Sequence, residues 1–361
     1  MKVLLLSKYP RKGASSRLRS FQYLPFLKEQ GVEVVVSSLF DERYLDLLYE
    51  TGRKPRFHSV LLYLRRLWAF VQCFRYDIVW IEYELLPYMP AFGERLLKRF
   101  SRPYVVDYDD AVFHNYDLSG NRWVRRLLGR KIDAVMRNAS AVIAGNQYLA
   151  DRARQAGADR VVVIPTVVDR LRYQPQSTFE DEELIIGWIG SPSTQRYVVG
   201  IGEALGRACR ETGARLVLVG ATPSVADALP GIPVDVIPWS EDSEAELVSR
   251  MSVGIMPLED GPWERGKCGY KLIQYMACAV PVVASPVGVN SVIVGDNECG
   301  LLADSSDDWS ASLLGLLRSR ERRDVLGQAG RHAVESHYSL QVQAPVLHDV
   351  LVTACHRQQK G

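Results

Sequence analysis

Short apolar runs alternate with helical patterns along almost the whole chain, and this alternation constrains the fold more than any other feature. In the first half, runs with the length and β-branched content of buried strands lie at residues 3–6, 33–36, 77–81, 104–107, 142–144 and 161–164. They recur at residues 184–189, 215–220, 234–237, 254–256 and 281–284. Strands that alternate with helices form parallel sheets with helices on both faces. The pattern predicts an α/β protein with two doubly wound domains in tandem.

The alternation is interrupted once, at residues 171–183, which read LRYQPQSTFEDEE. This stretch is polar and acidic and contains a proline, as a linker does. We therefore expect an N-terminal domain at residues 1–170 and a C-terminal domain at 184–336. In such sheets a ligand binds beyond the carboxyl ends of the strands, so two facing domains would enclose one cleft.

Composition excludes several classes of protein. The six cysteines form no CxxC pair, which argues against a zinc or disulfide framework and fits a reducing compartment. The apolar run near the N-terminus is shorter than that of a signal peptide, and no stretch is apolar enough to span a membrane. The net charge of +2 conceals a basic first half and an acidic second half, so the two halves are expected to face different partners. These features predict a cytoplasmic protein.

A glycine-rich loop precedes a helical pattern at RGKCGYKLIQYMA, and two lysines lie at its front. A cation there opposes the helix dipole, whereas a bound anion would reverse the sign of the interaction. Gly266 and Gly269 would let the backbone approach such a ligand closely. Lys267 and Lys271 therefore suggest a phosphate group.

Two further strand ends carry the same combination of glycine, hydroxyl and cation. RKGASSRLRSF has Gly13, then Ser15 or Ser16 as helix caps, then Arg17. GSPSTQRYVVG begins at Gly190, offers Ser193 or Thr194 as caps, and places Arg196 in the first turn. Three cationic helix starts around one cleft predict a pyrophosphate ligand.

Several of these segments resemble the retaining glycosyltransferases of the family 4 type, which have the GT-B fold of two Rossmann-like domains. The most specific match is MACAVPVVASPVG, which is similar to the helix and strand that follow the family's acidic motif. VIPTVVD is similar to the family's approach to the second domain, and GWIGSPSTQR to its strand, loop and helix at the donor diphosphate. The stretch DYDD, followed by His114, resembles an acidic segment in which a histidine borders the sugar.

The chain departs from this family at the acidic motif itself, a pair of glutamates. Gly266 stands at the first position and Gln274 at the second. The second glutamate is thought to hold the ribose hydroxyls, which a glutamine oxygen could also do without charge. Loss of the first leaves the contact to the donor sugar unassigned.

The resemblance implies transfer of a sugar from a nucleotide diphosphate sugar to an acceptor hydroxyl, with no metal and no cofactor. The residues expected to contact the donor diphosphate are Arg196, Lys271, Lys267, Ser191, Gly269, Gly13 and Arg17. Those expected at the ribose and base are Gln274, Tyr270 and Trp239. His114 and Asp110 are the expected catalytic residues, and Asp109 is placed on the acceptor side.

Two other functions remain open from the sequence. A nucleotide-sugar 2-epimerase shares a similar two-domain fold and would interconvert sugars without an acceptor. A non-catalytic subunit that binds sugar nucleotides would fit the missing pair of glutamates.

Two arginine-rich amphipathic segments in the first half, at residues 60–74 and 122–128, predict docking on an anionic inner membrane face. The first contains Arg65, Arg66, Leu62, Trp68 and Phe70 and is followed by Arg75. A lipid-linked or otherwise anionic acceptor would follow. No nucleic-acid-binding module is recognisable, so nucleic acid is not an expected partner. Residues 337–361 are expected, by resemblance, to pack back on the first domain.

Overall fold

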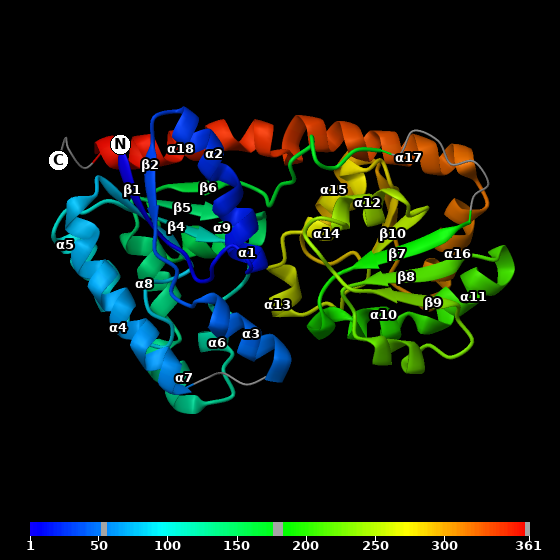
Figure 1. Cartoon of the computed structure of the whole chain (residues 1–361), viewed down its shortest axis with the longest axis horizontal. Coiled ribbons are helices and arrows are strands. Elements are labelled where there is room, and N and C mark those ends of the chain that lie inside the picture. The colour runs from blue at the N-terminus through cyan, green and yellow to red at the C-terminus, as the bar shows by residue number, and fades with distance from the viewer. Residues whose placement is uncertain (52–55, 176–182, 358–361) are drawn as a thin grey trace. The chain divides into compact units, whose positions relative to one another are not determined.

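The computed structural model describes residues 1–51, 56–175 and 183–357, and it divides into two compact units (Figure 1). The first unit comprises Met1–Thr166, Gly266–Cys268 and the chain from Gln343 onward. The second comprises Val167–Arg265 and Gly269–Val342.

The first unit is built on a parallel six-stranded sheet in the order β2-β1-β3-β4-β5-β6. Its strands are β1 Lys2–Leu6, β2 Glu33–Val36, β3 Ile78–Glu82, β4 Tyr104–Tyr108, β5 Ala141–Ala144 and β6 Val161–Val163. Its helices are α1 Ala14–Arg19, α2 Leu24–Glu29, α3 Glu42–Thr51, α4 Arg56–Gln72, α5 Phe92–Arg99, α6 His114–Asp117, α7 Arg122–Leu128, α8 Lys131–Asn138 and α9 Gln147–Gln155. Every residue of β3, β4 and β5 is buried, as expected for strands covered on both faces.

The second unit repeats this architecture, with the strand order β12-β11-β10-β7-β8-β9. Its strands are β7 Ile185–Ile189, β8 Arg215–Val219, β9 Val234–Ile237, β10 Val253–Met256, β11 Val282–Ala284 and β12 Gly300–Leu302. Its helices are α10 Arg196–Gly200, α11 Gly202–Thr212, α12 Glu244–Ser249, α13 Pro262–Arg265, α14 Tyr270–Ala277, α15 Val289–Asn297, α16 Ser306–Leu317 and α17 Arg320–Ala333, followed by α18 Leu340–Arg357, which continues into the first unit.

Two apolar cores lie on opposite faces of the second sheet, because successive strand residues point to opposite sides. Ile186 and Trp188 of β7 join the core that α11 and α16 cover. Ile189, at the end of the same strand, joins the core that α14 covers. The predicted α/β fold with two doubly wound parallel sheets is confirmed.

Local boundaries differ from the sequence-based expectation in three places. The helix expected at residues 18–30 is two short helices, because the chain turns through residues 20–23 and Pro25 opens α2. The helix expected at 60–74 begins at Arg56. β12 was not predicted, since a three-residue strand carries little periodic signal.

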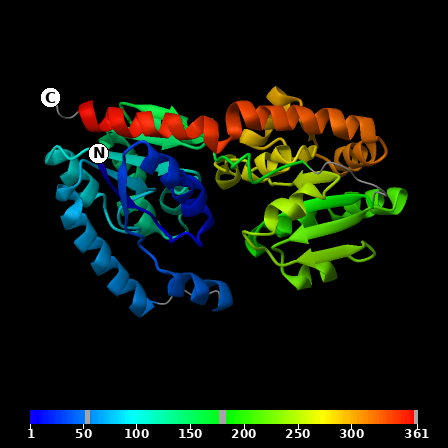
Figure 2. The same cartoon turned by 45° about the horizontal axis from the view of Figure 1, so that its top comes forward.

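The expected linker lies partly outside the described residues, at 176–182. The C-terminal part of α18 belongs to the first unit, where Leu347, Leu351 and Ala354 are buried and the Cys355 thiol contacts the Asp77 carbonyl at 3.9 Å. Figures 1 and 2 both show this part of the helix alongside the first sheet. No helix in the described ranges has the length and hydropathy to cross a bilayer.

Candidate functional site

At the carboxyl end of β7, in the second unit, the Lys271 ammonium lies beside the backbone of Gly190. A Cβ at Gly190 would overlap the Trp188 ring and would lie 2.9 Å from the Nζ of Lys271. That Nζ is 4.6 Å from the centroid of the Trp188 ring. Glycine at this position therefore leaves room for an ammonium beside the backbone at a central strand end.

Lys271 is the second residue of α14, whose first turn has no acidic side chain. Gly269 is the N-cap and has φ of +65°, a conformation that glycine adopts without strain. The ammonium thus lies where the helix dipole is also positive. This places Lys271 as the sequence predicted, at a helix start that favours an anion.

Arg196 opens α10, shortly after β7. Its Nη2 lies 2.9 Å from the hydroxyl of Tyr197 and 3.8 Å from the Oε1 of Glu264, on α13. The hydrogen bond to Tyr197 is the main cause that raises the pKa of Arg196. The side chain remains 65% exposed, so its guanidinium is held on one side and open to solvent on the other.

The loop between β7 and α10 is capped differently from the expectation. Ser191, and not Ser193 or Thr194, is the N-cap of a short 3-10 turn at Pro192–Thr194. The Ser191 side chain is also 2.9 Å from the Ser193 hydroxyl. A contact of Ser191 with the diphosphate stays a prediction.

The residues expected at the ribose and base meet in one hydrogen-bond network of the second unit. Gln274 donates to the Tyr173 hydroxyl at 2.9 Å, and Tyr173 donates to Glu244 at 2.7 Å. Glu244 also accepts from the indole N–H of Trp239 at 2.7 Å. Tyr270, one turn before Gln274, hydrogen-bonds to the same tyrosine. Trp239 is 37% exposed and follows β9.

Sequence reasoning missed Tyr173 and Glu244. Tyr173 lies in the stretch that its composition marks as linker, and Glu244 opens α12 after an acidic loop. No periodicity distinguishes either residue from its exposed neighbours. Only the fold brings these two side chains to Gln274.

In the first unit, the predicted capping of α1 is wrong. Gly13 is the N-cap of α1, which has no side-chain cap, so neither Ser15 nor Ser16 caps it. The Ser16 hydroxyl donates instead to Glu82 at 2.6 Å. Arg17 is only 6% exposed and lies in the last turn of this six-residue helix. Gly13 is needed for close packing, since a Cβ there would overlap the Tyr9 side chain.

The acidic pair Asp109 and Asp110 lies just after β4. The Asp109 side chain accepts a hydrogen bond from the Tyr83 hydroxyl, and its carbonyl accepts one from the Cys268 thiol at 3.1 Å. The backbone carbonyl of Asp110 accepts from Val112 at 2.8 Å. Both residues thus belong to a loop at the carboxyl end of the first sheet.

His114 has both ring nitrogens engaged within the first unit. Its Nδ1 is 2.8 Å from Asp117 and its Nε2 is 2.9 Å from the Tyr148 hydroxyl. Since a carboxylate only accepts, Nδ1 carries the proton of the neutral ring, and Nε2 accepts from Tyr148. A catalytic role for His114 stays a prediction, and it would require Tyr148 to release Nε2.

Residues 266–268 belong to the first unit, where Asn146 anchors them. Its side-chain amide donates to the carbonyls of Gly266 and Lys267, both at 2.9 Å. A Cβ at Gly266 would overlap Ala111, so this backbone has no room for a glutamate unless Ala111 shifts. Lys267 therefore lies in the first unit and Lys271 in the second. Whether Lys267, Gly13 and Arg17 act on the same ligand as Lys271 stays a prediction.

A second missed feature is a buried carboxylate at the end of β3. Glu82 accepts from the Lys8 amide at 2.9 Å as well as from Ser16. Burial raises the pKa of Glu82 to about 7, against the lowering effect of these two hydrogen bonds. This carboxyl therefore titrates near neutrality.

The raised pKa of Glu82 predicts a pH-dependent stability. Between the unfolded value of 4.5 and about 7 the folded chain binds this proton more tightly, so stability falls as pH rises through that window. Glu82→Gln, which mimics the protonated acid, should match the wild type at pH 4, below the unfolded pKa, and exceed it at pH 8 by up to about 3 kcal/mol. Urea unfolding at both pH values measures this; an equal difference at both would contradict it.

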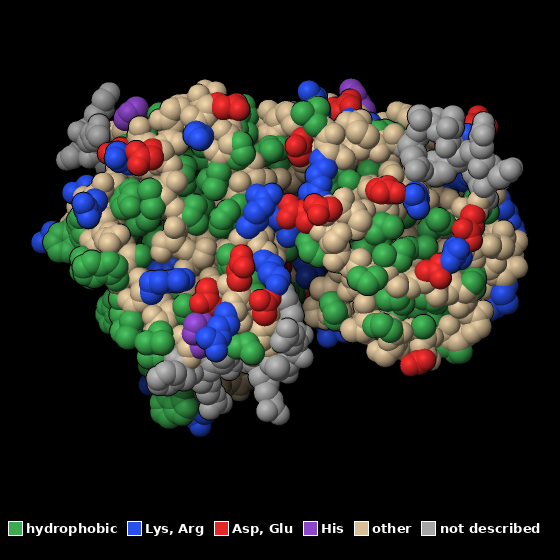
Figure 3. Space-filling model, in the orientation of Figure 1, with side chains coloured by type: hydrophobic (Ala, Val, Ile, Leu, Met, Phe, Trp, Pro, Cys, Tyr) green, Lys and Arg blue, Asp and Glu red, His purple; other side chains and the backbone are tan. Residues whose placement is uncertain are grey.

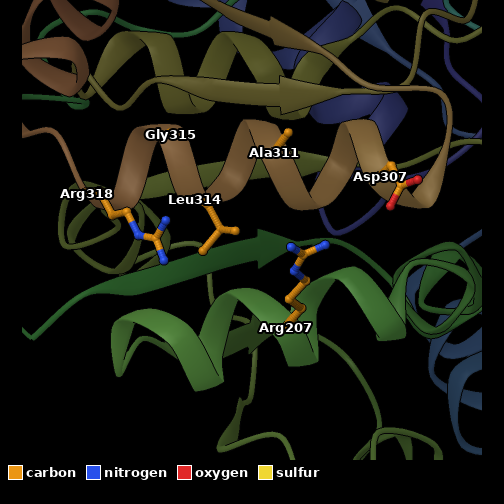
Figure 4. A pocket seen from close by; sticks show the side chains of 6 residues that line it. All are labelled: Arg207, Asp307, Ala311, Leu314, Gly315 and Arg318. Atoms are coloured by element: carbon orange, nitrogen blue, oxygen red, sulfur yellow. The ribbon is translucent and has the colours of Figure 1, made fainter.

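A surface notch between α11 and α16 is a separate feature of the second unit (Figure 4). Its arginines, Arg207 and Arg318, point into it, but both are paired with Glu211. We assign it no function. No cluster of three or more metal-ligating side chains occurs in the described ranges.

The geometry defines an α/β protein with two doubly wound parallel sheets, the second of which has the Lys271 ammonium at a helix start beside the end of its central strand β7. Residues 4–166 match the model described as a glycosyl transferase 4-like domain, and residues 183–319 match glycosyl transferases group 1. Together these ranges cover most of the chain, which therefore belongs to this family of glycosyltransferases.

A curated relative is the D-inositol 3-phosphate glycosyltransferase of Segniliparus rotundus, 25% identical over an alignment of 231 residues that covers 57% of this chain. The matched part is only 50% of that protein, so the chain spans about half its length.

Among solved structures, the sucrose-phosphate synthase of Thermosynechococcus elongatus has a TM-score of 0.72 at 16% identity and covers 98% of both chains. Anabaena HepE, solved in complex with UDP-glucose, has a TM-score of 0.72 at 15% identity and covers 98% of this chain and 100% of its own. These likenesses establish the GT-B fold.

Proposed function

We propose that this protein is a retaining glycosyltransferase that moves a sugar from a nucleoside diphosphate sugar to an acceptor hydroxyl. The observation that carries the proposal is the Lys271 ammonium beside Gly190, at the end of β7 and the start of α14. Membership of the glycosyltransferase family supports the reaction class, and the HepE relative was solved with UDP-glucose.

The chemistry follows from the charge of the leaving group. Breaking the bond between the sugar and the diphosphate builds negative charge on the diphosphate. Fixed cations and helix amide groups aimed at that charge stabilise the transition state. Lys271, Arg196 and the first amides of α14 would supply this stabilisation, and no metal ion is then needed.

A donor screen tests the proposal. We expect one of the UDP-, GDP- and dTDP-sugars to raise the melting temperature of the purified protein, as a ligand of the folded state does. With an acceptor, the nucleoside diphosphate should be released, NMR should show the donor's anomeric configuration in the product, and EDTA should not abolish transfer. If no donor stabilises the protein, the proposal fails.

Other outcomes would identify a different function. Interconversion of the donor sugar without an acceptor would identify a 2-epimerase. Donor binding without hydrolysis or transfer would identify a non-catalytic subunit, which the crowding at Gly266 favours. Inversion at the anomeric carbon would overturn the retaining mechanism alone.

We further propose that the acceptor is lipid-linked or otherwise anionic, in surface polysaccharide or glycolipid synthesis at the inner membrane face. Leu61, Leu64, Trp68 and Val71 form one stripe along α4, and each is at least 54% exposed. Further exposed apolar residues lie on α5, at Phe92 and Leu96, and just after it at Phe100, whose ring is 5.8 Å from that of Phe74. The exposed cations of α5 are Arg95, Lys98 and Arg99. Hydrophobic side chains gather along this edge of the first unit in Figure 3. An apolar face bordered by cations suits an anionic bilayer surface.

One predicted member of this membrane face is corrected. Arg66 is 2% exposed and donates to the Ser7 carbonyl, so it points into the first unit and not toward a membrane. Leu62 is likewise buried, at 4%. In the segment at 122–128, Trp123 and Leu127 are exposed as expected.

Vesicle co-sedimentation tests the membrane face. The wild type should bind phosphatidylglycerol vesicles more than phosphatidylcholine vesicles. The double variant Leu64→Glu, Trp68→Glu should lose about tenfold or more in partitioning, because it removes two large apolar contacts and adds two negative charges. Val325→Glu, at a 64% exposed position on α17, is the matched control and should bind normally. Equal binding to both lipids would contradict the proposal.

A further inference from the structure

A chain of hydrogen bonds connects the carboxylate of Glu244 to the side-chain amide of Gln274 through the hydroxyl of Tyr173. Gln274, Tyr173 and Glu244 are each 2% exposed. The Nε2 of Gln274 lies 2.9 Å from the Tyr173 oxygen, which lies 2.7 Å from the Oε1 of Glu244. The same Oε1 lies 3.2 Å from the Nη2 of Arg172, and the other oxygen, Oε2, accepts from the Trp239 indole N–H at 2.7 Å.

The donors around Glu244 determine which way each bond runs. Arg172 and the Trp239 indole can only donate, so both carboxylate oxygens act as acceptors. The Tyr173 hydroxyl must then give its single proton to Glu244. Its oxygen is left with lone pairs alone, and it can only accept from Gln274.

This direction orients the Gln274 amide. An amide that donates to Tyr173 turns its NH₂ group toward that residue and its carbonyl Oε1 away from it. Within the described residues Oε1 makes no hydrogen bond, and it is not sealed from solvent. Gln274 also lies three residues after Lys271 on α14, a spacing that places both side chains on one helix face.

We propose that Tyr173 and Glu244 are positioning residues, which hold the Gln274 amide so that its Oε1 accepts a ribose hydroxyl of the nucleotide. The inference rests on the proposed function, because it takes the ligand of Lys271 to be a nucleoside diphosphate. It explains how a neutral glutamine supplies an acceptor without the charge of a carboxylate: a remote carboxylate sets the orientation through one tyrosine.

Calorimetric binding of UDP and GDP, each beside its 2′-deoxy counterpart, tests this orientation. One neutral hydrogen bond predicts that the wild type binds the ribose form about five- to tenfold more tightly. In Tyr173→Phe the amide can rotate, so this ratio should fall to about one or two. The ratio between diphosphate and monophosphate should not change, because Lys271 is untouched.

Two further variants separate orientation from folding. Tyr275 is on α14 with Gln274, and its buried hydroxyl bonds the backbone of Ile189 and Ile255. Tyr275→Phe should therefore keep the full ratio of ribose to 2′-deoxyribose affinity. The glutamate in Gln274→Glu has two equivalent oxygens, so it presents an acceptor to the ribose in either orientation of its carboxylate. In that background, Tyr173→Phe should no longer lower the ratio.

The possible outcomes distinguish failure of the proposed function from failure of the positioning proposal. If the wild type binds no nucleoside diphosphate, the proposed function fails. If it binds them without preferring ribose, or if folded Tyr173→Phe keeps the full ratio, the positioning proposal fails and the function stands. Should Tyr173→Phe not fold, Gln274→Met decides the matter: a ratio near one supports the acceptor role, and an unchanged ratio overturns it.

Discussion

Replacing Lys271 by alanine is expected to lower kcat/KM for sugar transfer by about 10²- to 10³-fold, the usual effect of removing one group that stabilises transition-state charge. The ammonium lies at the end of β7 beside Gly190, which has no side chain between it and the backbone. Stability should change by no more than about 1 kcal/mol, since losing the contact with Trp188 and relieving the opposed helix dipole offset each other. Steady-state kinetics and thermal unfolding of the same preparation measure both.

Lys267→Ala is the comparison for this prediction. Lys267 is four residues earlier, in the loop before α14, and belongs to the first unit, where its carbonyl is held by Asn146. Its loss should lower kcat/KM by tenfold or less. Equal losses in the two variants would show that the position of Lys271 at the strand end has no special value, and an active Lys271→Ala would refute the diphosphate assignment.

Replacing Asp107 by alanine is expected to destabilise the first unit by about 3–5 kcal/mol, because it leaves a buried guanidinium without its counter-ion. Arg19 is 2% exposed, and its Nη2 and Nε lie 2.8 and 2.9 Å from the Asp107 carboxylate. It also donates to the Ile164 carbonyl at 2.8 Å. Burial raises the pKa of the Asp107 carboxyl, and the nearby guanidinium opposes that effect.

The double variant Arg19→Met, Asp107→Leu tests whether the loss comes from the stranded charge. Replacing a buried pair by apolar residues of similar volume is often neutral, so the double variant should recover most of the stability. Denaturant unfolding followed by circular dichroism gives the three free energies. A loss below about 1 kcal/mol in Asp107→Ala would mean that solvent or another group compensates the arginine.

Features that depend only on residues close together in the chain, such as a buried strand or a helix start, were predictable from the sequence. The apolar runs that became β3, β4 and β7 carry their own evidence, because a strand covered on both faces must be apolar along its length. The position of Lys271 was predictable for the same reason: the glycines and the helix pattern around it are local. The family resemblance rested on such local segments as well.

Only the tertiary structure decided which distant side chains meet. Arg19 and Asp107 are 88 positions apart, Tyr173 and Glu244 are 71 apart, and Gln274 and Tyr173 are 101 apart. It also turned Arg66 inward, although its neighbours on α4 face solvent. Local propensity and hydrophobic periodicity act over a few residues. The partner of a buried charge depends on how the strands are ordered in the sheet, and the residues near that charge do not encode this order.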